Sequence, residues 1–411
     1  MVGMTVSKRI CKRAFAGAVA YLALAGAAFS QSSEVRIEPG APIVIGGYWV
    51  LSGGDAALGN DQKRGVELAI KDLNGTILNH PVRLLAEDSQ CSAEGGQTAA
   101  TKLASNPAVV GVIGPSCSSE ATAAAPILWN AGLVSIGTSA TAPSLTAPDR
   151  KADYKGFLRT VFSDADQGPA DAKWIHDGLK AKTVVTIHDG SPYTQQLTAE
   201  MAKTFTGLGG KIASQEAVAP TDVDMRPLLA RIATEKPDAV YVPIFVPATA
   251  QILKQAKQTP GLEKVAFIGG GGTMSPDIMD AAGDAVIGFY GAFPDVTPEA
   301  QGKDYPKLLQ NYQDEYGEAP TSGFVANAYD ALTLLRMALE KSAKTEADGT
   351  VVVDKKALHD ALFTIKFSGM SGDISCTADG QCSAFKPGIY QYQSADRSSF
   401  AIGTNPKKIY P

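Results

Sequence analysis

The sequence has few of the residues from which metal centres and catalytic clusters are built. It contains only four histidines, which are His80, His176, His188 and His359. No two of them have metal-pair spacing, and no Gly-x-Ser-x-Gly elbow is present. The formal net charge of −5 also argues against the clustered basic surface of a nucleic-acid-binding protein. We therefore expect no metal, no other cofactor and no nucleic-acid partner.

Long apolar runs are also scarce, and the one that stands out lies near the start. Four basic residues between positions 8 and 13 precede an apolar stretch from Ala14 to Ala28. In Ala28-Phe29-Ser30, small residues stand three and one positions before an expected cleavage site after Ser30. A membrane anchor is the alternative, but the stretch is shorter than the roughly 20 residues of a spanning helix. A lipid anchor would need a cysteine after the stretch, and Cys11 precedes it. The pattern predicts a signal peptide over residues 1–30 and an N-terminal extension over 31–41.

Four cysteines follow that cut, namely Cys91, Cys117, Cys376 and Cys382. An even number in an oxidising compartment indicates disulfides, and three pairings are possible. Spacing favours Cys91 with Cys117 and Cys376 with Cys382, because the Asp379-Gly380 turn brings the last two together. Zinc is the competing interpretation, but the close Cys-x-x-Cys pairs that zinc sites use are absent.

The hydrophobic pattern from Pro42 to Thr160 predicts a parallel sheet covered by helices on both faces, since short β-branched runs alternate with amphipathic stretches. The expected strands are Ile43–Tyr48, Val82–Glu87, Val109–Ile113, Val134–Ile136 and Leu158–Thr160. The expected helices are Asp61–Leu73, with Asn60 or Asp61 as N-cap, Glu94–Ala104 and Ser119–Ala131.

A second unit with the same alternation begins near Asp166. Its expected strands are Val184–His188, Lys211–Ala217, Ala239–Val242 and Val265–Ile268, and its expected helices are Pro169–Leu179, Gln195–Leu208, Met225–Glu235 and Ala248–Gln258. Beyond Gly288–Ala292, the expected helices are Lys303–Tyr316, Phe324–Lys341 and Lys355–Leu362, followed by a β-hairpin over Gly372–Tyr392. These helices exceed what the second sheet can cover. The predicted fold class is α/β, with two doubly wound parallel-sheet lobes between which the chain crosses more than once.

The loops that follow the predicted strands are the expected ligand site, because ligands of open α/β sheets bind beyond the carboxyl ends of the strands. Gly114–Ser119 and Gly137–Thr141 are rich in hydroxyl residues, which suit a carboxylate. The alternative is that these residues only cap helices and turns. Tyr193 and Phe245 follow strands of the second unit and would cover an apolar ligand, with ordinary core packing as the alternative.

Two sequence patterns give only weak evidence, one for a hydrolase and one for nucleotide binding. His188-Asp189 would suit a Ser/His/Asp hydrolase, but adjacent residues cannot easily place a base and the group that orients it. The run Gly269–Gly272 lacks the spacing of the known phosphate-binding loops.

Several short motifs follow one another in a specific order, which is Leu51-Ser52-Gly53, Gly59, Gly65–Asn74, Glu87-Asp88 with Cys91, Gly114–Ser119, Ser139–Thr146, Arg159-Thr160, Asp166–Gly168, Ile187–Asp189 with Tyr193, Gly283-Asp284 and Ala328–Ala331. This order resembles that of the type I periplasmic leucine/isoleucine/valine-binding proteins of ABC transporters. The likeness spans about Pro42 to Tyr392. By this resemblance Cys91–Cys117 is the family's disulfide, Ser118, Ser139 and Thr141 hold the α-carboxylate of the ligand, and Tyr193, Phe245 and Phe324 line the rest of the cleft.

The resemblance also implies the architecture and the role. One lobe would comprise 42–160 plus 293–366 and the other 161–292 plus 367–411, joined by a hinge of three crossings. The protein would be a monomer in the periplasm that carries a small amino acid or other carboxylate to an ABC permease in the inner membrane, without catalysis. A periplasmic ligand sensor that signals to a receptor is the alternative, and a cleft hydrolase is the more remote one.

Two positions depart from the family pattern. Gly271 stands where the amino-acid binders have an acidic residue that pairs with the ligand ammonium, and Leu58 replaces a bulky aromatic residue. Burying an unpaired ammonium is costly, so either another acid such as Asp189 or Asp277 substitutes or the ligand has no ammonium. Both changes remove volume, which favours a larger or differently shaped ligand such as an aromatic or aliphatic acid or an amide.

Overall fold

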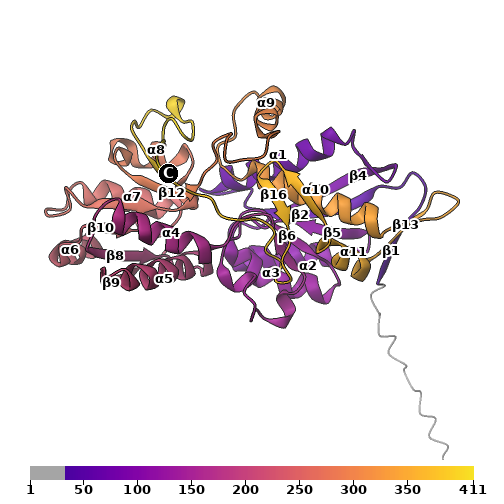
Figure 1. The fold of residues 1–411 in the computed structure, drawn as a ribbon, viewed down its shortest axis with the longest axis horizontal. Helices are drawn as coiled ribbons and strands as arrows, with labels where there is room; N and C mark the ends of the chain where they lie inside the picture. Colours follow the sequence, from indigo (N-terminus) through magenta and orange to yellow (C-terminus); the bar gives the residue numbers. More distant parts are fainter. Residues whose placement is uncertain (1–32) are drawn as a thin grey trace, which may run out of the picture. The chain divides into compact units, whose positions relative to one another are not determined.

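The computed structural model describes residues 33–411, and the predicted signal peptide lies outside the described residues. Two large sheets dominate this part of the chain (Figure 1). The first has the order β3-β4-β2-β5-β6-β7, with β2 at Ile43–Trp49, β3 at Thr76–Ile77, β4 at His80–Asp88, β5 at Val109–Ile113, β6 at Ser135–Gly137 and β7 at Phe157–Arg159. The helices around it are α1 (Ala56–Asp72), α2 (Ala93–Ala104), α3 (Ser118–Asn130), α9 (Tyr305–Tyr316), α10 (Val325–Ser342) and α11 (Lys355–Leu362). Sheet and helices together are called the first lobe.

Strand β2 explains why helices cover both faces of the first sheet. Its side chains alternate between the two faces, as in any strand. Ile43 and Ile45 join a buried cluster that includes Leu335 of α10, whereas Val44 joins a second cluster with Leu103 of α2. Figure 1 shows α1 and α10 on one side of this sheet and α2 and α3 on the other. A strand buried on both faces therefore reads as a continuous apolar run, as the sequence predicted.

The second lobe is built in the same way. Its sheet has the order β18-β17-β12-β11-β10-β8-β9, with β8 at Thr183–His188, β9 at Lys211–Ala217, β10 at Ala239–Tyr241, β11 at Ala266–Gly269, β12 at Tyr290–Pro294, β17 at Pro387–Gln391 and β18 at Lys407–Tyr410. Its helices are α4 (Asp164–Asp177), α5 (Pro192–Gly207), α6 (Arg226–Glu235), α7 (Val246–Ala256) and α8 (Asp277–Ala282). Val240 faces the α6 and α7 side, and Tyr241 faces the α4 and α5 side. The predicted fold class, with two parallel-sheet α/β lobes, is confirmed.

The chain passes between the lobes three times. The passages lie between β7 and α4, between β12 and α9, and between β16 (Gly372–Ser375) and β17. The lobe boundaries stay a prediction, and one of them differs from the packing. The sequence assigned 367–411 to the second lobe, whereas Ile374 and Cys382 are buried in the core of the first sheet. We therefore place the third boundary after Cys382.

Two local predictions were wrong. The expected hairpin over Gly372–Tyr392 does not form, because β16 pairs with β15 (Lys366–Gly369) and β17 pairs with β12 and β18. The first long helix begins at Ala56 rather than after Asn60 or Asp61. Asp61 instead accepts hydrogen bonds from Tyr312 and from the backbone of Thr321 and Ser322. These partners lie far along the chain, which is why the local pattern misidentified the cap.

The N-terminal extension contains a strand. β1 (Glu34–Ile37) pairs with β14 (Val351–Asp354), which also pairs with β13 (Lys344–Thr345). Both predicted disulfides, Cys91–Cys117 and Cys376–Cys382, are formed, so these cysteines are not available to zinc. Within residues 33–411, no helix combines the length and the apolar character needed to cross a bilayer.

Candidate functional site

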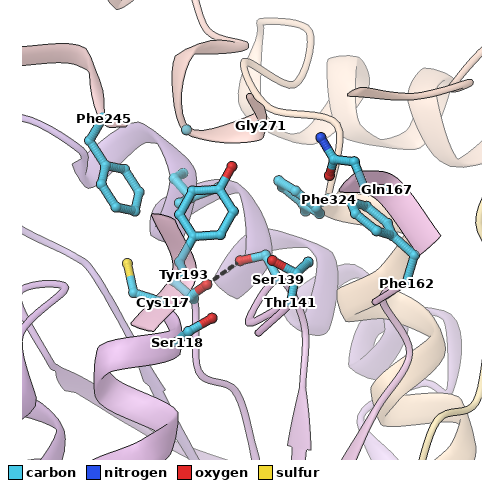
Figure 2. Close-up of a pocket in the computed structure, with 13 residues that line it drawn as sticks. Cys117, Ser118, Ser139, Thr141, Phe162, Gln167, Tyr193, Phe245, Gly271 and Phe324 are labelled. Carbon is cyan, nitrogen blue, oxygen red and sulfur yellow. Dashed lines mark hydrogen bonds between the residues drawn. The ribbon is translucent and has the colours of Figure 1, made fainter. Parts of the chain in front are cut away.

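A small cavity lies where loops of both lobes meet (Figure 2). Its walls are formed by Leu58, Ser116, Cys117, Ser118, Ser139, Thr141, Phe162, Gln167, Tyr193, Phe245, Gly271, Gly272 and Phe324. All seven residues that the sequence predicted as ligand-binding are in this set. That they contact a ligand stays a prediction. Figure 2 shows the hydroxyls of Ser118, Ser139 and Thr141 grouped beneath the rings of Tyr193 and Phe324.

Ser118, Ser139 and Thr141 form one side of the cavity, which we call the hydroxyl floor. They lie in the segments that follow β5 and β6 of the first lobe. Parallel strands end at the same edge of a sheet, so the two loops after them lie side by side. The buried carboxylate of Glu120 accepts the backbone N–H groups of Ser116 and Cys117 at 3.1 and 2.9 Å. Burial raises the pKa of Glu120 to about 7. Glu120 and the Cys91–Cys117 disulfide therefore fix the start of α3, from which Ser118 projects.

The hydroxyls of Ser118, Ser139 and Thr141 differ in whether they already donate a hydrogen bond within the protein. Ser139 donates to the carbonyl of Ser116 at 2.6 Å, the hydrogen bond drawn in Figure 2. Thr141 lies 3.0 Å from the carboxylate of Asp164. Ser118 instead accepts the backbone N–H of Ala142 at 3.1 Å, and its own proton has no acceptor among the described residues. Ser118 is thus the hydroxyl that can donate to an anion without losing another bond.

Asp164 is a buried acid directly behind this floor. Desolvation is the main cause that raises its pKa, to about 8, while the hydrogen bond to Thr141 and the charge of Arg159 oppose the rise. At neutral pH the carboxyl group is therefore mostly protonated. A protonated Asp164 can donate to Thr141, which frees the threonine proton for a bound anion.

Arg159 is buried in the core, where it binds the loop that carries Ser139 and Thr141, and it does not line the cavity. Its guanidinium donates to the carbonyls of Ala140 and Ala142 at 3.1 and 3.0 Å and to the hydroxyl of Thr146 at 2.6 Å. The side chain is fully buried. These bonds hold the segment that carries Ser139 and Thr141, which gives the Arg159-Thr160 motif a structural role.

Aromatic rings from the second lobe and from α10 form the remaining walls. Tyr193 in the first turn of α5 and Phe245 before α7 have ring centroids 5.8 Å apart. Phe324 precedes α10 and meets Phe293 edge-on at 5.1 Å. The Tyr193 hydroxyl accepts the backbone N–H of Gly272, and burial raises the pKa of this phenol well above its usual value. The cavity thus has a polar floor and apolar sides.

The glycine run after β11 is explained by these rings. A Cβ at Gly270 would lie 2.5 Å from the Tyr193 hydroxyl, and a Cβ at Gly272 would lie 2.9 Å from the Phe245 ring. A Cβ at Gly271 would be 3.2 Å from Phe293, which is tight but less severe. The close packing of ring against backbone accounts for glycine here without a phosphate ligand.

No charged side chain is among the described residues that line this cavity. Asp189, one predicted substitute for the missing acid, accepts from Thr194 at 2.6 Å and lies outside the wall. Asp277, the other, pairs with Arg397 at 2.8 Å and borders a neighbouring cavity. His188 also lies outside the wall. Neither the ammonium partner nor the hydrolase pair that the sequence suggested is present in this cavity.

Five lining residues were not named individually as ligand-binding, which are Ser116, Cys117, Phe162, Gln167 and Gly272. Ser116 and Cys117 lie in the predicted site loop Gly114–Ser119, and two of the others also carried a detectable signal. Phe162 lies three residues after β7, where the chain leaves the first lobe, and Gln167 lies in the motif Asp166-Gln167-Gly168. Its amide donates to Asp171 and to the carbonyl of Ala292, both at 3.2 Å. Its place in the wall depends on how α4 is seated, which local sequence does not reveal.

Comparison with known proteins agrees with this architecture. A family described as periplasmic binding protein matches residues 42–391. The leucine-, isoleucine-, valine-, threonine-, and alanine-binding protein of Pseudomonas aeruginosa is 28% identical over 91% of this chain and 94% of its own length. The solved structure of a leucine-binding protein from Thermotoga maritima superposes with a TM-score of 0.77 at 25% identity, covering 86% of this chain and 96% of that one.

A third relative shares the fold with a different ligand. The solute-binding protein of Rhodopseudomonas palustris solved with 3,4-dihydroxybenzoic acid has a TM-score of 0.70 at 23% identity, covering 86% of this chain and 93% of that one. The family match over most of the chain points to the same family as the motifs in the loops that follow the strands. The chain belongs to the family of periplasmic leucine/isoleucine/valine-binding proteins.

Proposed function

We propose that the protein is the substrate-binding component of an ABC importer and holds a small carboxylate-bearing ligand between its lobes. The observation that carries this proposal is the wall of the cavity, in which a hydroxyl floor from one lobe faces aromatic rings supplied largely by the other. Hydroxyl and backbone donors stabilise a carboxylate without a buried countercharge, and the rings cover its apolar body. Ser118, Ser139 and Thr141 would hold the carboxylate, and Tyr193, Phe245 and Phe324 would cover the rest.

Contacts between the lobes are consistent with a closed, ligand-holding form. Gln196 of α5 donates to the Ser144 hydroxyl at 3.0 Å and accepts the Ser144 backbone N–H at 2.9 Å. We infer that the ligand favours this closed form by touching both lobes at once, and that the permease recognises the closed form. Family membership and the predicted signal peptide support a location in the periplasm.

The ligand class follows from the cavity rather than from the relatives, because their ligands differ. The P. aeruginosa protein is named for leucine, isoleucine, valine, threonine and alanine, and the R. palustris protein was solved with 3,4-dihydroxybenzoic acid. In this chain Gly271 replaces the expected acid and no lining residue described here carries a charge. We propose that the main cavity takes an aromatic or aliphatic carboxylate, or an amide, in preference to an α-amino acid.

We also infer that the protein binds its ligand without converting it and acts as a monomer. The described wall holds no histidine, and the carboxyl beside a lining hydroxyl, that of Asp164 next to Thr141, is mostly protonated at neutral pH because burial raises its pKa to about 8, so it is a poor general base.

Isothermal titration calorimetry tests this function. Benzoate, 3,4-dihydroxybenzoate, short alkyl carboxylates, their amides and leucine are titrated into the mature chain. The expected result is one ligand per chain, a raised melting temperature and an unchanged ligand on recovery. Chemical conversion of a bound probe, or failure of every small acid and amide to bind, would contradict the proposal. Uptake into vesicles that carry the partner permease then separates transport from sensing.

A further inference from the structure

A second, smaller cavity, with room for a group about the size of one water, adjoins the ligand cavity. The two share three wall residues, Leu58, Gly271 and Gly272. The remaining walls of the second cavity are Gly54, Asp55, Ala57, Val246, Met274, Ser275, Asp277 and Ser322. We call it the side chamber. Unlike the ligand cavity, it has carboxylates in its wall.

Two polar atoms in the wall of the side chamber lack a hydrogen-bond partner within residues 33–411. They are the Oδ1 atom of Asp55 and the Oγ atom of Ser322, and both are buried. Ser322 is only 5% exposed. A buried polar atom without a partner is unfavourable, and a water, an ion or a ligand group can satisfy it. Two of them in the wall of one cavity point to a ligand that carries hydrogen-bond donors.

The ordinary structural roles of Asp55 do not use this oxygen. Asp55 is the N-cap residue of α1, yet its side chain makes no capping hydrogen bond. The carboxylate instead accepts the backbone N–H of Val246, at the start of α7 in the other lobe. Only one carboxylate oxygen takes part, because Oδ1 has no partner in the described chain. Asp55 therefore contacts the second lobe and still has an acceptor to offer.

The charge around Asp55 favours a cationic or N–H-bearing guest. Burial is the main cause that raises the pKa of Asp55, to about 6, and the carboxylates of Asp277 and Asp189 raise it further. Asp277 shares its partner Arg397 with Asp280, so one guanidinium faces two carboxylates. The free oxygen thus lies in a partly desolvated region of negative potential, where an ammonium or amide N–H is bound more strongly than in water.

We propose that the side chamber is a second recognition site for the transported ligand, in which Asp55 and Ser322 accept hydrogen bonds from an amine or primary amide group. This inference rests on the proposed function, because the same ligand would place its carboxylate on the hydroxyl floor of the main cavity. The ligand class would then be a carboxylate with a distant amine or amide, such as an ω-amino acid, rather than an α-amino acid.

Matched probes test the inference by isothermal titration calorimetry. The ω-amino carboxylates with two to five methylene groups are compared with alkyl carboxylates of the same heavy-atom count. At the chain length that spans both cavities, the amine-bearing probe is expected to bind wild type at least tenfold more tightly than its alkyl match. Asp55→Asn, which keeps an acceptor for Val246, and Ser322→Ala should each reduce that ratio by about tenfold or more without weakening the alkyl probe.

Asp280→Asn is the charge-matched control, because Asp280 also pairs with Arg397 and lies outside the side-chamber wall. It should leave the ratio unchanged. Melting temperatures confirm that each variant folds, and Ser322→Ala provides the test if Asp55→Asn does not. If the alkyl probes bind but the amine adds nothing at any length, or if Asp55→Asn and Ser322→Ala leave the ratio intact, the side-chamber inference is wrong while the proposed function stands. If no probe binds, both are overturned.

Discussion

The hydroxyl of Thr141 lies 3.0 Å from the carboxylate of Asp164, and this bond joins the floor of the cavity to the first turn of α4. The backbone N–H of Asp164 donates in turn to the carbonyl of Thr141, also at 3.0 Å. The pair thus links a hydroxyl in the cavity wall to a buried titratable group.

This pair predicts that carboxylate binding weakens as the pH rises through about 8. Below the pKa of Asp164, which burial raises to about 8, the neutral acid donates to Thr141 and frees the threonine proton for the ligand. Above it, the ionised acid takes that proton and repels the ligand's charge. Calorimetry from pH 6 to 9 should show falling affinity in wild type and a flatter profile in Asp164→Asn. Asp166→Asn, an exposed neighbour on α4, should keep the wild-type profile, and a flat wild-type profile would contradict the mechanism.

Ser118 is expected to matter more for ligand binding than Ser139. The Ser118 hydroxyl proton is uncommitted among the described residues, whereas that of Ser139 is held by the Ser116 carbonyl. Losing a hydrogen bond to a charged group costs about 1.5–3 kcal/mol, so Ser118→Ala should weaken carboxylate binding at least tenfold. Ser139→Ala should have a smaller effect on the dissociation constant. Thermal unfolding checks that the loops are intact, and equal losses in the two variants would contradict the assignment.

Gly271→Glu is expected to shift the preference towards α-amino acids. A Cβ at this position would be 3.2 Å from the Phe293 ring, so small adjustments of the ring admit a side chain. The new carboxylate would give an α-ammonium the partner that the cavity wall lacks. The measurement is the ratio of dissociation constants for leucine and its deaminated analogue. Gly271→Gln has nearly the same shape without the charge and should leave the ratio close to wild type, and a similar ratio in both variants would show that charge is not responsible.

Asp171 is expected to make the fold less stable as the pH rises. It is 1% exposed, and desolvation is the main cause that raises its pKa to about 7, against hydrogen bonds from Tyr241 and Gln167. A carboxyl with a raised folded-state pKa stabilises the fold fully below its unfolded pKa near 4, and that contribution is lost as the pH rises through about 7. Asp171→Asn should therefore flatten the fall of melting temperature between pH 4 and 8. The effect is on the order of 1–4 kcal/mol. Parallel curves for the two proteins would exclude Asp171 as the source.

The sequence predicted those parts of the fold and site that follow from local pattern and sheet topology. Strand β5 was predicted at Val109–Ile113, because an apolar β-branched run between polar segments has few alternatives. Ser118 and Ser139 could be placed near one another because they follow β5 and β6, neighbouring strands of one parallel sheet that end at a common edge. These inferences need no knowledge of distant contacts.

The parts that were missed depend on contacts that only the folded chain creates. Asp61 is typical of a helix N-cap in the sequence. In the structure it accepts hydrogen bonds from the Tyr312 hydroxyl and the Ser322 backbone N–H, which lie far along the chain. Asp55 and Asp164 are ordinary acids in the sequence, and their importance comes from burial beside the cavities. The hairpin at the C-terminal end was mispredicted because β17 finds a longer partner in β12.

The division of the cavity between the lobes has a consequence for the rates of ligand exchange. Ser118 and Ser139 lie on the first lobe, where Glu120 and a disulfide hold the loop of Ser118 and Arg159 holds the segment of Ser139. Tyr193 and Phe245 lie on the second lobe. A ligand can therefore dock on the polar floor while the lobes are apart, and the rings arrive only on closure. We expect changes to the hydroxyls to alter initial capture, and changes to the two rings to act chiefly on the residence time of the captured molecule.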